Sequence, residues 1–178
     1  SMIQTILFAT DLGVFSPHIL QHVMSLASKC DARIVVVHAV EPLGSFANAV
    51  VKTYLPEGSS DEIQADGLIK MMRTIKNSII DALAEEYMDG EQGLSRIIDV
   101  SVVQGRPAEV ILDKAEKRNA DLIIMGSHGP NAMKSNMLGS VTSKVLQLAK
   151  VPVYMVPMMD PSYLSQLEPQ KQMPLWGS

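Results

Sequence analysis

Five short apolar runs alternate along this chain with segments of helical periodicity, and this alternation limits the fold more than any other feature. The second run is β-branched and almost continuously apolar, which is typical of a parallel strand covered on both faces. Strand–helix–strand order favours a parallel sheet with right-handed crossovers. The sequence therefore predicts an α/β fold, a five-stranded open parallel sheet with helices on both faces, Rossmann-like, in the order 3-2-1-4-5. The predicted strands are residues 4–9, 33–39, 97–103, 122–125 and 151–156.

The segments between these strands predict helices of different quality. Ser16-Pro17 offers a cap followed by proline at a first helical position, and Gly105-Arg106-Pro107 turns the chain into another helix. Residues 41–66 are irregular and read as a long loop with room for one short helical piece. We expect one domain over residues 2–157 and an extended tail over residues 158–178, which carries three prolines. A longer helix is predicted after the irregular segment over residues 41–66. It ends near Asp89-Gly90 and carries one apolar face: Leu68, Met72, Ile75, Ile79 and Leu83.

Composition excludes several classes of protein. The net charge is −4 and no block of Lys or Arg occurs, which argues against a nucleic-acid partner because clustered positive charge supplies most of that affinity. Cys30 is the only cysteine, so neither an internal disulfide nor a Cys-rich zinc site can form. No apolar run approaches 18 residues and no signal sequence is evident. We expect a cytoplasmic protein with no membrane partner.

A glycine loop follows the fourth predicted strand. Gly126-Ser127-His128-Gly129 opens it, and Gly139-Ser140 closes it where a helical pattern begins. A strand that leads through glycines into a helix can hold phosphate, because backbone N–H groups and the helix N-terminus both attract anions. The loop lacks the lysine of a Walker A motif and does not follow the first strand as a dinucleotide fingerprint does. The alternative is an ordinary strand-to-helix connection with glycines at tight turns.

Asp11 follows the first strand and completes a candidate site. In the predicted strand order the first and fourth strands are neighbours, so their carboxyl ends place Asp11 beside Gly126 at the switch point where ligands bind. A carboxylate there can accept bonds from ribose hydroxyls or bind a metal; alternatively Asp11 only caps a turn. Ser127 and Ser140 can donate to phosphate or cap turns.

The four histidines carry weaker signals. His128 could contact phosphate, but a solvated loop residue is the simpler interpretation. His38 ends a buried strand and is interpreted as a core histidine with a satisfied ring. His18 and His22 lie four residues apart on one helix, a spacing that can grip a metal, yet no carboxylate partner is evident and we expect a helix surface.

These motifs resemble the universal stress protein family, in its ATP-binding branch. The family pattern G-x2-G-x9-G-(S/T) is met by Gly126, Gly129, Gly139 and Ser140. The first strand with its terminal Thr10-Asp11, the second-strand end at residues 36–40, the helix entry G-x-P-x3-I-x3-A from Gly105, and residues 120–126 also resemble the family. The resemblance covers about residues 2–157. The segment over residues 12–16 is longer than usual in the family.

The resemblance implies a ligand and a set of contacts. The ligand would be ATP, with AMP or ADP as alternatives and Mg²⁺ as an optional companion. Thr10 and Asp11 would lie at the ribose, and the backbone of Ala39 and Val40 at the adenine. The phosphates would meet Gly126, Ser127, His128, Gly129, Gly139, Ser140 and Ser143.

Three functions fit this interpretation. The first is a nucleotide-dependent regulatory protein of the stress response, which forms a homodimer through its last strand. The second is an enzyme, a slow ATPase or a nucleotidyl transferase of a related α/β fold. Against fast catalysis, Lys134 is the only cation within the loop and no arginine finger is evident. The third is a scaffold with an empty site, which the retained glycines disfavour.

Overall fold

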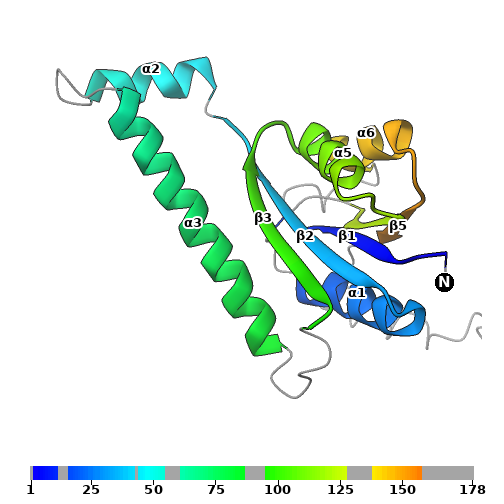
Figure 1. Cartoon of the computed structure of the whole chain (residues 1–178). Coiled ribbons are helices and arrows are strands. Elements are labelled where there is room, and N and C mark those ends of the chain that lie inside the picture. The colour runs from blue at the N-terminus through cyan, green and yellow to red at the C-terminus, as the bar shows by residue number, and fades with distance from the viewer. Residues whose placement is uncertain are drawn as a thin grey trace, which may run out of the picture.

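A computed structural model describes residues 2–11, 16–42, 44–54, 61–86, 95–127 and 138–157. Five parallel strands form one sheet in the order β3-β2-β1-β4-β5, which confirms the predicted topology (Figure 1). The strands are β1 Thr5–Ala9, β2 Arg33–Val40, β3 Ile97–Gln104, β4 Leu122–Gly126 and β5 Val153–Val156. The helices are α1 Ser16–Cys30, α2 Ser45–Tyr54, α3 Asp61–Glu86, α5 Pro107–Lys117 and α6 Ser140–Leu148.

β1 lies at the centre of the sheet and is buried on both faces. Leu7 is in register with Val35 of β2 on one side and with Ile123 of β4 on the other. All three side chains are fully buried, as expected for central strands of a parallel sheet with helices on both sides. The winding reverses between β1 and β4, and that reversal leaves a crevice at the carboxyl ends of these two strands.

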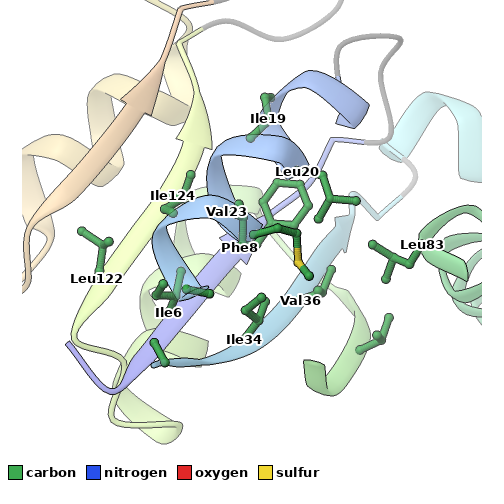
Figure 2. Close-up of a cluster of buried hydrophobic side chains, with 14 of the residues drawn as sticks. Ile6, Phe8, Ile19, Leu20, Val23, Ile34, Val36, Leu83, Leu122 and Ile124 are labelled. Carbon is green, nitrogen blue, oxygen red and sulfur yellow. The ribbon is translucent and has the colours of Figure 1, made fainter. Parts of the chain in front are cut away.

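The core consists of two apolar layers, one on each face of the sheet. α1 and the carboxyl half of α3 pack on one face, where Phe8 and Val36 meet Ile19, Val23 and Leu83 (Figure 2). α5 and α6 pack on the other face, against Leu7, Val35 and Ile123. Alternation along each strand explains this division, because successive side chains point to opposite faces.

The prediction of a long loop over residues 41–66 is wrong in part. α2, a helix of ten residues, is the helical piece for which the prediction left room, but α3 begins at Asp61 instead of after Asp66. Figure 1 shows α2 at the far end of α3, away from the sheet. Phe46 and Tyr54 on α2 are 83% and 85% exposed, so packing against the core does not define this helix and its pattern gave a weak signal.

The remaining predictions for the helices agree with the structure or lie outside it. On α3, Ile79 and Leu83 are buried and Leu68, Met72 and Ile75 are half-buried, as their spacing predicts. The expected end near Asp89-Gly90 and the expected tail over residues 158–178 lie outside the described residues. Within the described ranges, no helix is both long and apolar enough to span a membrane.

Candidate functional site

A cleft of about 780 Å³ opens at the carboxyl ends of β1, β2 and β4. Three residues predicted for the site meet there: Asp11 follows β1, Gly126 ends β4, and Ser140 begins α6. Thr10, Ala39, Val40 and Gly139 also line the cleft. Seven of the eleven residues predicted for the site therefore share one cavity, at the topological switch point of the sheet.

Hydrogen bonds join the two ends of the glycine loop, at the end of β4 and the start of α6. The N–H of Gly139 donates to the carbonyl of Ser127 over 3.3 Å. Thr142 Oγ1 donates to the carbonyl of Gly126 over 3.0 Å, and Thr142 is only 3% exposed. These bonds fix the first turn of α6 against the end of β4. Backbone N–H groups in the first turn of a helix have no intrahelical partners and attract anions.

Gly139 is the N-cap of α6 and has ordinary backbone angles, φ −59° and ψ 150°. Its glycine identity is therefore not required by a left-handed conformation. The other reason for glycine at such a position is the absence of a Cβ, which lets a ligand approach the backbone closely. Gly139 lines the cleft, where the absence of a Cβ leaves its backbone open to close approach.

The residue after β1, Thr10, is held by two hydrogen bonds with β2. The N–H of Thr10 donates to the carbonyl of Val37 over 3.0 Å. His38 Nδ1 donates to the carbonyl of Thr10 over 2.7 Å. His38 is thus satisfied as predicted, although it is half-buried and lines the cleft instead of lying in the core. Asp11 comes directly after this fixed residue and is exposed at the cleft.

The end of β2 presents backbone groups to the cleft. β1 ends in register with Val37, whereas β2 continues to Val40. N–H and C=O groups alternate sides along a strand, and the carbonyl of Val37 faces β1 while that of Val40 accepts from Gly105 beside β3. The N–H and C=O of Ala39 therefore point to the β1 side, beyond the last residue of β1. Of the two residues predicted for adenine, Ala39 presents its backbone to the cleft and Val40 lines it.

Apolar side chains from four helices form the walls. Ile19 of α1, Met71 and Ile75 of α3, Ile111 of α5 and Val141 of α6 line the cleft, together with Met125 of β4. The contribution of α3 was missed from the sequence, because nothing local shows that the middle of this helix passes the sheet edge. Thr142 was missed too. The signal available in the sequence was a threonine next to the apolar positions of α6, where its hydroxyl would need a partner.

The charges that line the described part of the cleft are both acidic. They belong to Asp11 and Glu41, and no Lys or Arg is among the described lining residues. Any attraction for phosphate on these walls therefore comes from backbone dipoles and the start of α6. A divalent cation bound with the phosphates would reduce their repulsion from the two carboxylates.

Four predicted site residues lie elsewhere or outside the description. Ser127 is buried and does not line the cleft, and its N–H donates to the carbonyl of Val156. Ser143 lies one turn into α6, where its N–H donates to the carbonyl of Gly139, and it does not line the cleft. Neither residue is placed at the cavity. His128 and Gly129 lie outside the described residues.

Known proteins are similar to this chain in sequence and in fold. A universal stress protein of Thermus aquaticus is 34% identical over 155 residues, which cover 87% of this chain and 99% of that protein. YxiE of Bacillus subtilis is 30% identical, over 87% of this chain and 99% of its own. The solved structure of MJ0577, a universal stress protein of Methanocaldococcus jannaschii, superposes with a TM-score of 0.66 at 25% identity and covers 90% of this chain and 99% of that one. A universal stress protein crystallised in complex with cAMP has the same fold, with a TM-score of 0.52 at 20% identity over 88% of this chain and 98% of that one.

The match to a family extends over nearly all of the described chain. The universal stress protein family matches residues 2–157, which include all five strands and both ends of the glycine loop. The sheet order, the crevice at its switch point and the glycine spacing therefore have one explanation: this chain belongs to the universal stress protein family.

Proposed function

We propose that this protein binds ATP in the cleft and acts as a nucleotide-dependent regulatory module of the stress response. The observation that carries the proposal is the meeting of Asp11, Ala39 and the start of α6 in one cavity of about 780 Å³. A cavity of this size lies within the range of pockets that hold small-molecule ligands.

The residues of the cleft fit the three parts of a nucleotide. Ala39 offers a backbone donor and a backbone acceptor, the pair that adenine needs. The Asp11 carboxylate can accept bonds from ribose hydroxyls. The phosphates would lie at Gly126, Gly139 and Ser140, where α6 begins, with Gly129 expected beside them. The walls from α3 and α5 are apolar and would exclude water from the base.

One relative supports the proposal that the ligand is a nucleotide. Which nucleotide binds has to be measured. One family member of the same fold was crystallised with cAMP, which shares adenine and ribose with ATP. ATP is favoured here because the glycine loop extends the site beyond the ribose. Mg²⁺ would accompany the phosphates opposite the acidic groups of Asp11 and Glu41.

A slow ATPase is the second candidate. Hydrolysis at a useful rate needs positive charge on the transferred phosphoryl group. The described lining of the cleft contains no Lys or Arg, and Lys134 in the glycine loop lies outside the described residues. We therefore favour binding that changes partner recognition, through a shift between conformations, over catalytic turnover.

The first experiment identifies the ligand directly. Mass spectrometry of small molecules released from the purified protein should detect ATP, or AMP, ADP or cAMP in its place. Calorimetry should then show that Gly129→Asp weakens ATP binding at least about tenfold, or ~1.4 kcal/mol, because the glycine pattern predicts that the added Cβ and negative charge would lie against the phosphates. Unchanged affinity in that variant would remove the loop from the site.

Gly44→Asp is the matched control. It makes the same change of residue at a glycine that does not line the cleft, and a Cβ at Gly44 would meet no atom within 4 Å. Its ATP affinity should equal that of the unchanged protein. A loss in both variants would indicate an effect of added negative charge instead of a local contact.

We further propose that two copies pair through β5 and that the protein works in the cytoplasm. β5 ends the described sheet, with β4 on its inner side, and an unpaired strand edge is a template for pairing with another chain. Tyr154 on this strand is 38% exposed. Light scattering should give the mass of a dimer at micromolar protein; a monomer mass would contradict the pairing.

A further inference from the structure

Two histidines and a tyrosine gather on the α1 face of the sheet, apart from the residues of the cleft. His18 and His22 lie on successive turns of α1, and their ring centroids are 5.1 Å apart with the planes at 85°. Tyr154 reaches them from β5, with its hydroxyl 3.0 Å from Nδ1 of His22. None of the three residues lines the cleft.

We infer that His18 and His22 form a binding site for a divalent transition metal, with Tyr154 as the residue that positions His22. Side chains four apart on a helix lie on the same face. Two imidazole nitrogens each about 2.1 Å from one ion would lie roughly 3 Å apart. Rings whose centroids are 5.1 Å apart and whose planes are nearly perpendicular can reach that arrangement by small side-chain rotations.

The hydrogen bond to Tyr154 orients the ring of His22. A histidine that ligates a metal through one ring nitrogen generally donates from the other to a fixed acceptor. The Tyr154 hydroxyl can accept from Nδ1–H of His22, which leaves the Nε2 lone pair directed away from the tyrosine and available to the ion. This bond joins α1 to β5, two elements separated by more than 120 residues of sequence.

The donor set defines the class of ion. Imidazole suits Zn²⁺, Ni²⁺ and Cu²⁺, whereas Mg²⁺ and Ca²⁺ prefer oxygen. In the described parts of the chain no third His, Cys, Asp or Glu joins a cluster of this kind, so water molecules would complete the coordination. His18 also lies in the first turn of α1, where the helix dipole disfavours a cation. The affinity should therefore be moderate.

The test is titration of the purified full chain with NiCl2, and in parallel with ZnCl2, by calorimetry. The decisive variant combines His18→Gln with Gln21→His. It keeps the number of histidines and the other candidate ligands, including His38, His128 and Cys30, but changes the spacing from four residues to one. Positions 18 and 21 are both exposed, so the fold should tolerate the exchange, and an unchanged melting temperature without metal confirms this.

We expect one Ni²⁺ site per chain whose affinity falls at least tenfold in the double variant. Tyr154→Phe, which keeps both histidines, should weaken Ni²⁺ binding about tenfold, within the range for loss of a second partner of a ligating histidine. MgCl2 in large excess should not displace Ni²⁺. Equal Ni²⁺ affinity in the double variant would overturn the site, and equal affinity in Tyr154→Phe would overturn the role given to Tyr154.

Discussion

The two ends of the sheet differ in what their aspartates do. At the amino end, Asp121 precedes β4 and its Oδ2 accepts hydrogen bonds from the N–H groups of Gln4 and Thr5, over 2.9 and 3.0 Å. The N–H of Asp121 in turn donates to the carbonyl of Thr5. At the carboxyl end, Asp11 follows the same central strand β1 and lines an open cleft.

The surroundings of a carboxylate differ between the two ends of a parallel strand. At the start of a strand the first N–H groups need acceptors, and Asp121 supplies one from the neighbouring strand. At the end of a strand the chain turns away and the neighbouring helix presents its N-terminus, so the space favours a ligand. Substitutions at the two ends should therefore separate stability from binding.

Asp121→Ala should produce the largest effect, and it should be an effect on stability. Two charge-assisted bonds to backbone N–H groups are lost, which should lower the free energy of unfolding by about 3 kcal/mol. Urea denaturation measures this value. ATP affinity should stay unchanged at temperatures where the variant is folded. A loss of ATP affinity without a loss of stability would contradict the structural role given to Asp121.

Asp11→Ala should weaken nucleotide binding and leave stability almost unchanged. If the carboxylate accepts from the ribose hydroxyls, ATP and AMP should both bind about thirtyfold more weakly, or ~2 kcal/mol, because both carry the same sugar. The melting temperature should change little. Calorimetry with each nucleotide, with and without Mg²⁺, measures the effect.

Two other outcomes would assign Asp11 differently. A metal role predicts that ATP binding weakens in the presence of Mg²⁺ while AMP binding does not. A turn role predicts unchanged affinity for both nucleotides and a lower melting temperature. Either result would contradict the ribose assignment.

Thr142→Val tests the joint between β4 and α6. The substitution keeps the shape of the buried side chain but removes the hydroxyl that donates to the carbonyl of Gly126. We expect the free energy of unfolding to fall by about 1 kcal/mol and ATP affinity to fall with it, since the start of α6 loses its fixed position. Thr142→Ser, which keeps the hydroxyl, should retain most of the affinity; equal loss in both variants would assign the effect to packing.

Asp99 should give the smallest effect, present near neutral pH and lost in acid. Burial raises the pKa of this carboxyl, but the hydrogen bond from Ser101 and the charges of Lys114 and Arg118 outweigh it and hold the pKa below its ordinary value of 3.8. A carboxyl whose pKa is lower in the folded state contributes stability above pH 3.8, which is lost as the pH falls below that value.

Asp99→Asn should therefore cost a few tenths of a kcal/mol at pH 7, and this difference from the unchanged protein should shrink in acid. Urea denaturation between pH 5 and pH 2.5 measures the difference. A gap that stays constant over this range would show that the charge of Asp99 contributes nothing.

The sheet could be predicted from the sequence because each strand is an apolar run with its own boundaries. Asp11, Gly126 and Ser140 could be predicted for the same reason, since they directly follow or precede such elements. The contribution of Met71 to the cleft wall could not be predicted, because it depends on how a helix of 26 residues passes the sheet. The glycine pattern predicts Ser127 at the ligand, yet Ser127 is buried and donates its N–H to the carbonyl of Val156 in β5.

The length of α3 has a mechanical consequence. Ile79 and Leu83 hold its carboxyl half on the sheet, while Met71 and Ile75 line the cleft farther along the same helix. Measured from Ile79, Met71 lies about 12 Å and Asp61 about 27 Å along the axis at 1.5 Å per residue. If α3 turned as a rigid rod about Ile79, a displacement of Met71 by a molecule in the cleft would be roughly doubled at Asp61.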